Sequence, residues 1–324
     1  MSKKLIGIEI GSDTIKLSLV SDGKLLGAAI ARMPDNLVLE GRVTAPATMS
    51  QLIKDLCKEL GTRPGPCAFV LPSQGLITRT LTMPVMSDKE LALNLPYEFK
   101  DYVGKNADGY VYDYAVTNVT DSAMELYAVA ASKEVIATYS DILAKAGMKV
   151  KAMVPQEAAW LNILQGAKNL PGTVCLVDLG HRSTRVSIYV GGKFAMSRNI
   201  ELAGHNLSDV ISRAEQVDIH VARNHKESNL DNCLTSDAAN DFYSSLAVEI
   251  MRTVIYFKTN FKDAPELTDI YYCGGSAKNE ALRNAILKQN NLVMHHVARL
   301  VNTDMKNEDL ILTCALSAGA AMQV

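Results

Sequence analysis

The chain has 324 residues, of which 48% are hydrophobic, 21% are charged and 6% are aromatic, and its formal net charge is −2. This length suggests about two domains, and the composition excludes intrinsic disorder, which requires few apolar residues and a high net charge. Because there is no basic excess, the sequence also argues against a nucleic-acid-binding surface, and we expect no nucleic-acid partner.

The first elements of the chain belong to a repeat. Residues 5–24 read LIGIEIGSDTIKLSLVSDGK and residues 174–193 read VCLVDLGHRSTRVSIYVGGK, and they align without a gap when Gly11 is placed opposite Gly180. Each copy has an apolar strand, a turn that begins with glycine, and an alternating strand with one buried face. A tight hairpin turn then leads into a third strand. The repeat therefore predicts that each half of the chain opens with the same antiparallel β-meander.

The rest of the first half predicts helices and strands in alternation. Apolar residues at helical spacing indicate a helix at Met49–Leu60, and Cys67–Leu71 has the pattern of a buried strand. We expect residues 78–153 to form an inserted subdomain. Its predicted elements are a strand, a helix, two strands and a second helix, at Ile77–Met83, Asp88–Tyr102, Tyr110–Asn118, Met124–Ala131 and Lys133–Ala146.

The second half adds helices to its own meander. Helices are expected at Pro155–Leu164, Asp241–Lys262 and Asn307–Met322, and a strand at Asp269–Cys273 runs into a Gly-Gly junction and a further helix. We predict an α/β fold of two domains. The first domain covers residues 1–77, 154–171 and 308–324, and the second covers 172–307, with about 214–268 as its outer subdomain.

Targeting signals are not expected. Six scattered cysteines without a CxxC pair argue against a zinc or dithiol site and favour a reducing, cytoplasmic compartment. The first apolar run meets Glu9 and Asp13 too early for a signal peptide, and Leu310–Val324 is too short for a membrane span. We therefore expect a cytoplasmic protein with no direct membrane insertion.

The two glycine turns are candidate phosphate-binding sites. Backbone N–H groups of residues 11–13 and 180–183 can bind phosphate oxygens, and glycine permits a close approach. Mg²⁺ is usually held by one or two carboxylates together with the phosphates, so Glu9 and Asp178 are candidate metal ligands. The junction at residues 274–276 is a candidate site for a base or ribose. Together these features are what a nucleotide clamp between two similar domains requires.

The same order of motifs resembles the actin-like ATPase superfamily. IGIEIGSDTIKL is similar to its first phosphate motif, LVDLGHRSTRVSIYVGGK to its second and YYCGGSAKNEALRNAI to its adenosine motif. Within the superfamily, the segments RTLTMPVMSDKELALNLPYEFKDYV, YDYAV, ELYAVAASKEVIATYSDILAKAGMKV and PQEAAW are most similar to the PilM-like type IV pilus assembly proteins. The resemblance implies an actin-like (ribonuclease H-like) two-domain ATPase fold with a duplicated β-meander and an inserted FtsA/PilM-type subdomain.

The resemblance also implies a cofactor site for ATP in the interdomain cleft. Mg²⁺ would be held through water by Glu9 and Asp178. The residues expected to contact the nucleotide are Gly11, Ser12, Asp13, Lys16, Asp178, Gly180, Ser183, Lys226, Gly274, Gly275 and Ser276.

Several positions depart from the superfamily pattern. Glu9 stands where Asp is usual, and His181 and Arg182 stand where small residues are usual. In the ribose-contacting Ala-Glu-x-x-Lys motif, Lys226 is kept but Arg223 takes the acidic position; a second register at residues 214–218 keeps the Glu and loses the Lys. The common Gly-Gly pair is Ala-Gly at residues 203–204. We therefore expect ATP binding with weak or absent hydrolysis.

The resemblance implies a scaffold that docks the cytoplasmic N-terminal peptide of a PilN-like membrane protein on the inserted subdomain and links it to the pilus motor ATPases. Self-association and a location at the inner face of the cytoplasmic membrane, through that partner, are also implied. Aromatic residues of the insert are either groove anchors or its core; alternation of Tyr110, Tyr112 and Tyr114 on one strand face favours the core. The alternatives are a small-molecule kinase of the superfamily and an FtsA-like cell-division filament protein.

Overall fold

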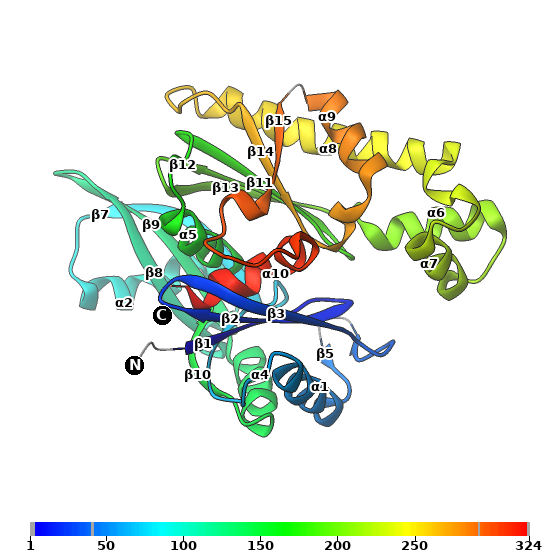
Figure 1. The fold of residues 1–324 in the computed structure, drawn as a ribbon. Helices are drawn as coiled ribbons and strands as arrows, with labels where there is room; N and C mark the ends of the chain where they lie inside the picture. The colour runs from blue at the N-terminus through cyan, green and yellow to red at the C-terminus, as the bar shows by residue number, and fades with distance from the viewer. Residues whose placement is uncertain (1–3, 40–41, 291, 323–324) are drawn as a thin grey trace.

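The computed structural model describes residues 4–39, 42–290 and 292–322. Two five-stranded sheets lie one above the other, and a three-stranded sheet extends to one side (Figure 1). The five-stranded sheets have the orders β10-β6-β1-β2-β3 and β13-β12-β11-β14-β15. In both, an antiparallel meander is extended by two parallel strands. The two halves therefore share one topology, and the repeated meander predicted from the sequence is confirmed.

The strand bounds follow the predicted alternation closely. The first sheet contains β1 (Lys4–Ile10), β2 (Thr14–Ser21), β3 (Lys24–Arg32), β6 (Pro66–Val70) and β10 (Lys149–Val154). The second contains β11 (Thr173–Leu179), β12 (Thr184–Val190), β13 (Lys193–Ile200), β14 (Asp269–Cys273) and β15 (Val293–His296). A short ladder joins β4 (Val38–Leu39) to β5 (Arg42–Val43). Both meander hairpins turn through two residues of positive φ, Asp22-Gly23 and Gly191-Gly192, as tight hairpins require.

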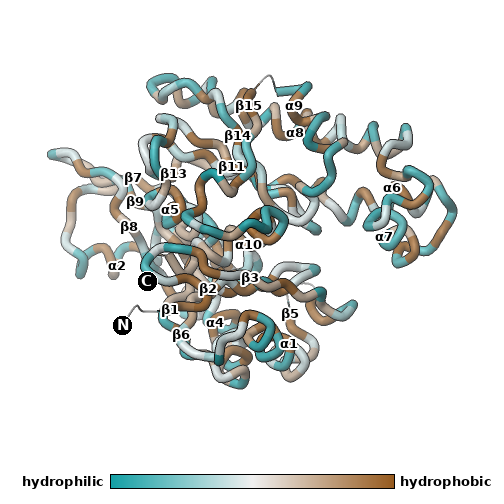
Figure 2. The backbone as a smooth tube through the Cα atoms, in the orientation of Figure 1, coloured by the Kyte–Doolittle hydropathy of each residue, from teal (hydrophilic) through white to brown (hydrophobic). Residues whose placement is uncertain are grey.

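Helices cover the outer faces of both sheets (Figure 1). Helices α1 (Pro46–Glu59) and α4 (Lys133–Lys145) pack on the first sheet, and α8 (Asp237–Asn260) and α9 (Glu280–Asn290) pack on the second. Beside α8 lie α6 (Gly204–Glu215) and α7 (Ile219–Ser228). Hydropathy follows this layering, because the central strands are largely hydrophobic and the outer loops hydrophilic (Figure 2).

Two helices rich in small residues, α5 (Gln156–Gly166) and α10 (Glu308–Ala321), lie between the sheets and pack on each other. A Cβ atom at Gly319 would lie 2.3 Å from the Ala159 carbonyl oxygen, and one at Gly7 on β1 would lie 1.7 Å from that of Ser317. Glycine is therefore what lets α10 approach both α5 and the first sheet so closely.

The inserted sheet has the order β7-β9-β8 and its own small core. It consists of β7 (Leu76–Pro84), β8 (Tyr110–Val119) and β9 (Ala123–Ser132), with α2 (Asp88–Glu98) and α3 (Lys100–Val103) against it. The insert was expected to continue to residue 153, but α4 and β10, which lie within that range, pack with the first sheet. Helix α4 buries its apolar face in the core of the first sheet, and β10 pairs with β6.

Two local features of the insert also differ from or refine the prediction. The single helix expected at Asp88–Tyr102 is broken at Phe99 into α2 and α3. Pro96, which cannot donate a backbone hydrogen bond, lies one turn before the break. The Phe99 ring is fully buried. Tyr110, Tyr112 and Tyr114 pack against the insert's core, as the alternation favoured. Tyr97 and Tyr102 are exposed.

Across the described ranges, no helix combines the length and apolarity that a bilayer crossing requires.

Candidate nucleotide site

The two glycine turns have the same internal geometry. The Gly11 N–H donates to the Thr14 carbonyl oxygen at 3.0 Å, and the Gly180 N–H donates to that of Ser183 at 3.2 Å. A Cβ at Gly180 would lie 2.6 Å from the Ser183 oxygen, so the second turn in particular requires glycine. Each turn connects the first two strands of its meander, so the repeat places them as equivalent parts of the two halves.

A cavity of about 150 Å³ lies between these turns. Ser12 and Asp13 line it from the first half of the chain, and His181, Arg182 and Arg223 line it from the second. His181 and Arg182, the two departures from the usual small residues, therefore face the first phosphate turn. The guanidinium groups of Arg182 and Arg223 beside backbone N–H groups make a favourable environment for a phosphate chain.

The three predicted residues Glu9, Lys16 and Asp178 line a second, small hollow. Lys16 Nζ lies 2.5 Å from Glu9 Oε1, and both side chains are only 12% exposed. Burial raises the pKa of Glu9 above its ordinary value; Lys16 opposes this increase and Asp178 adds to it. Burial alone would lower the pKa of Lys16, but the charges of Glu9 and Asp178 raise it above its usual range. The hollow thus holds two carboxylates around one ammonium group.

Asp178 has close neighbours on several elements. Gln156 at the start of α5 donates to Asp178 Oδ2 at 3.1 Å. Burial raises the pKa of the Asp178 carboxyl, while Lys16 and Arg185 act against this rise. A Cβ at Gly274 would lie 2.4 Å from Asp178 Oδ1, and Gly274 has φ +91°, so this position requires glycine twice over.

The predicted adenosine motif lies against the second glycine turn. Ser276 Oγ donates to the Gly180 carbonyl oxygen at 2.9 Å. Lys226 Nζ on α7 donates to the Gly204 carbonyl oxygen and to Ser208 Oγ, each at 2.7 Å. Burial, followed by the charge of Arg223, lowers the pKa of Lys226 to about 8. These contacts bring residues from α6, α7 and the Gly-Gly junction to one side of the cleft.

The Ala-Gly pair at residues 203–204 keeps the glycine that the packing needs. A Cβ at Gly204 would lie 2.4 Å from Ser276 Oγ, whereas Ala203 is buried without such a conflict. This departure from Gly-Gly therefore leaves the close contact between α6 and the adenosine motif intact.

The carboxylate pair fits part of a magnesium shell. No group of three or more His, Cys, Asp or Glu side chains that suits a metal ion is found in the part of the chain that the structure describes. Glu9 Oε2, however, is buried with no hydrogen-bond partner among the same residues. Mg²⁺ commonly takes only one or two carboxylates and completes its shell with water and phosphate. The donor set therefore suits a nucleotide-bound ion rather than a metal held by protein alone.

Sequence reasoning missed Gln156 and Glu157, although both stand in the PQEAAW segment. Glu157 is 1% exposed and binds Arg185 Nη1 at 2.6 Å and the Tyr127 hydroxyl at 3.1 Å. A polar pair at the start of a helix that consists mostly of small and apolar residues was the available signal. The side chains that Gln156 and Glu157 contact lie far away in the sequence, so these contacts could not be predicted.

Solved structures with the same fold include a PilM–PilN type IV pilus biogenesis complex, at 24% identity, 98% coverage of each chain and a TM-score of 0.86. EutJ, an ethanolamine utilization protein from Carboxydothermus hydrogenoformans, matches at 14% identity over 98% of this chain and 89% of its own, with a TM-score of 0.62. A ROK family glucokinase from Streptomyces griseus, in complex with glucose and AMPPNP, matches at 14% identity over 98% of each chain, with a TM-score of 0.51. These likenesses confirm the expected actin-like fold.

Residues 7–319 match the family model of the type IV pilus assembly protein PilM. Because this match covers nearly the whole sequence and agrees with the repeated meanders and the insert, the chain belongs to the PilM family of type IV pilus assembly proteins.

Proposed function

We propose that this chain is a nucleotide-binding scaffold of type IV pilus assembly. The observation that carries the proposal is the convergence of two equivalent glycine turns, each beside a carboxylate, on one cleft in a member of the PilM family. Family membership argues against the small-molecule kinase and the FtsA-like filament protein. The glucokinase with bound AMPPNP supports the capacity of this fold to hold a nucleotide in such a cleft.

In this proposal each part of the cleft has one task. Backbone groups of Gly11, Ser12, Asp13, Gly180 and Ser183 bind the phosphates, while Lys16 supplies positive charge beneath them. The remaining residues, Lys226, Gly274, Gly275 and Ser276, border the ribose and base. Asp178 and Glu9 would hold Mg²⁺ through water, and the ion would neutralise phosphate charge.

We expect ATP hydrolysis to be weak or absent. Glu9 is paired with Lys16 at 2.5 Å, so one of the two carboxylates near the phosphates already has a cation. Asp178 accepts a hydrogen bond from Gln156, which occupies part of its capacity as a base. Both interactions favour the ionised form of the carboxylate and so weaken it as a general base.

The partner would be the cytoplasmic N-terminal peptide of a PilN-like membrane protein, docked on the inserted subdomain. One solved structure with the same fold is a PilM–PilN complex, and the insert carries exposed apolar side chains, including Leu93, Tyr97 and Tyr102. Tyr and Leu supply the contact area that peptide grooves use. Through this partner the chain would sit in the cytoplasm at the inner face of the membrane. Contacts with motor ATPases and self-association are part of the same proposal.

The experiment is a thermal unfolding series with and without ATP and Mg²⁺. At a ligand concentration of roughly a hundred times Kd, binding stabilises the folded state by about 2.7 kcal/mol, a rise in Tm of a few degrees. Asp178→Ala should abolish the rise, whereas Asp304→Ala, an exposed carboxylate outside the cleft, should keep it. The same samples are titrated with a labelled PilN N-terminal peptide, which both variants should bind. An unchanged Tm for the parent protein would overturn the nucleotide part of the proposal.

A further inference from the structure

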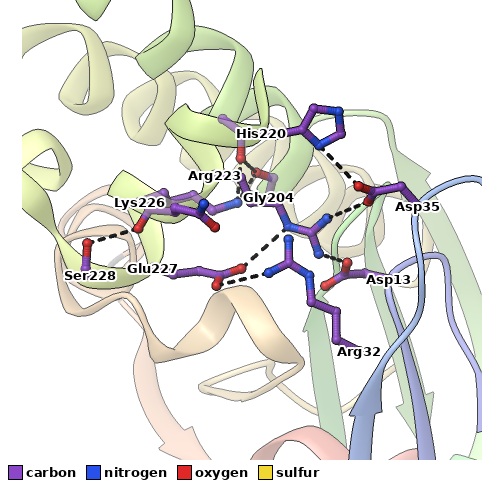
Figure 3. A network of polar contacts seen from close by, with 11 residues as sticks. Asp13, Arg32, Asp35, Gly204, His220, Arg223, Lys226, Glu227 and Ser228 are labelled. Atoms are coloured by element: carbon purple, nitrogen blue, oxygen red, sulfur yellow. Dashed lines mark hydrogen bonds and ion pairs between the residues drawn. The ribbon is translucent and has the colours of Figure 1, made fainter. Parts of the chain in front are cut away.

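An ion-pair network crosses the cleft beside the proposed nucleotide site (Figure 3). Its centre is Arg223 on α7, in the second half of the chain. One guanidinium nitrogen binds the carboxylate of Asp13 on the first glycine turn, and another lies 3.6 Å from Asp35 Oδ1. Asp13 and Asp35 both belong to the first half, so Arg223 joins the two halves directly.

Two neighbours on α7 extend the network. Glu227 lies 3.5 Å from Arg223 Nε and 3.4 Å from Nη1 of Arg32 at the end of β3. His220 Nδ1 lies 3.3 Å from Asp35 Oδ2. Residues three and four apart share one helix face, so α7 presents a single charged face to the first sheet (Figure 3).

Burial identifies the strongest member of this network. The Arg223 side chain is 11% exposed and that of Asp13 is 23% exposed. The side chains of Arg32, Asp35, His220 and Glu227 are about half-exposed, and exposed ion pairs contribute little to stability. Within this network, the contact between Arg223 and Asp13 is therefore the one expected to contribute most to stability.

The same contact lies in the wall of the cavity. Asp13 and Arg223 both line it, and its volume of about 150 Å³ is below the roughly 300 Å³ at which ligand pockets begin. A guanidinium binds carboxylate and phosphate through the same forked geometry. The carboxylate of Asp13 therefore competes for Arg223 with any phosphate that enters between the glycine turns.

We propose that Arg223 is an ion-pair latch. Without an anion it holds the two halves together through Asp13, and a phosphate group entering the cleft takes the place of Asp13 on the guanidinium. The replacement of Asp13 by phosphate rests on the proposed nucleotide site, but the closure of the two halves through Arg223 and Asp13 needs no nucleotide. The latch also gives a reason for Arg at position 223, because an acidic residue there would face Asp13 and Asp35 and repel them.

Closure is tested by the distance between two spin labels in the protein without nucleotide. Cysteines replace the exposed Glu59 on α1 and Asp241 on α8, and the six native cysteines are buried, so the labels attach selectively. The distance distribution is measured for the parent, Arg223→Gln, the isosteric Asp13→Asn and the double variant. The matched control is Arg252→Gln, which removes an arginine whose carboxylate partner, Glu249, lies on the same helix.

We expect one narrow distribution for the parent and the control, and longer, broader distributions for Arg223→Gln and Asp13→Asn. The double variant should resemble either single variant, because both remove the same contact. High salt should move the parent part of the way toward the variants. The latch is overturned if the variants keep the parent's distribution, or if the parent is already as broad as Arg223→Gln.

Exchange is tested with inorganic tripolyphosphate in a calorimetric titration. Asp13→Asn should bind it roughly tenfold more tightly than the parent, because a competing negative charge is removed, and Arg223→Gln should bind more weakly. Weaker binding by Asp13→Asn would overturn the exchange. If no protein binds tripolyphosphate, exchange and the nucleotide site both fail, and the label distances still decide the closure.

Discussion

Burial controls the protonation of basic side chains in the cleft. Burial lowers the pKa of His181 to about 4, and the nearby charges of Lys226, His205 and Arg182 act in the same direction. Lys226 has a pKa lowered to about 8 for similar reasons. The folded protein without an anion therefore resists further protonation of this cleft, and a bound phosphate would relieve the resistance.

This resistance predicts a pH dependence of stability. A histidine whose pKa falls from 6.5 to about 4 on folding binds more protons when unfolded, so its contribution is present above pH 6.5 and is lost as the pH falls toward 4. His181→Gln removes this contribution. Urea unfolding at pH 7.5, 5.5 and 4.5 should show a smaller loss of unfolding free energy in the variant than in the parent. Equal losses would mean that His181 is not held neutral.

At the scale of single residues, the sequence predicted which side chains belong to the site but not which side chains they contact. Glu9, Lys16 and Asp178 were expected from the repeat, and the structure brings them together. Arg223 was visible only as a departure from a motif. Its partner Asp13 lies 210 positions away, and no local pattern reports a contact that depends on how two halves close.

Among the elements, α10 packs closely on β1 and α5 because it meets both at glycine positions. Gly7 on β1 would place a Cβ 1.7 Å from the Ser317 carbonyl oxygen, a backbone atom that cannot move aside by rotation. By contrast, a Cβ at Gly166, at the end of α5, meets nothing within 4 Å. Alanine substitutions at these two positions therefore distinguish the cost of a steric clash from the effect of helix propensity.

Gly7→Ala should destabilise the protein by about 3 kcal/mol or more, because overpacking forces α10 away from the first sheet. Gly166→Ala is the matched control and should change the unfolding free energy by at most about 1 kcal/mol, in the stabilising direction. Both are measured by urea unfolding. A Gly7→Ala protein as stable as the parent would contradict the contact between β1 and α10.

The local sequence pattern predicts where most helices and strands lie but not which elements they pack against. The strands of both meanders and β14 were predicted within a few residues, because alternation and glycine turns are local signals. The place of α4 and β10 was not predicted, because β10 joins the first sheet through a parallel pairing with β6 across the whole insert. The break at Phe99 was hidden by an apolar pattern that continues through it.

For the whole molecule, Glu157 is a point where three parts meet. Its carboxylate binds Tyr127 of the inserted sheet, and Arg185 and Ser197 of the second sheet, from the start of α5. Arg185 also donates to Ser73 Oγ at 3.2 Å, just before the insert begins. The insert is thus tied to the second half of the chain as well as to the first.

Arg185→Met should destabilise the protein by about 3–5 kcal/mol, because it leaves the buried carboxylate of Glu157 without its cation. Arg198→Met is the control: it removes a more exposed arginine on the neighbouring strand β13, paired with Glu249 of α8, and should cost about 1 kcal/mol or less. Guanidinium unfolding measures both. Equal effects of the two substitutions would show that Glu157 does not depend on Arg185.

The position of α10 also has a consequence for the order of folding during synthesis. The hydroxyl groups of Ser18 and Ser317 lie 2.7 Å apart although 299 positions separate them. Strands β1, β2, β3 and β6 are synthesised well before α10, so the face that α10 covers stays unburied until that helix emerges. Contacts of such long sequence separation slow folding, and an uncovered apolar face invites aggregation. The nascent chain therefore carries an uncovered face of the first sheet until α10 has been synthesised.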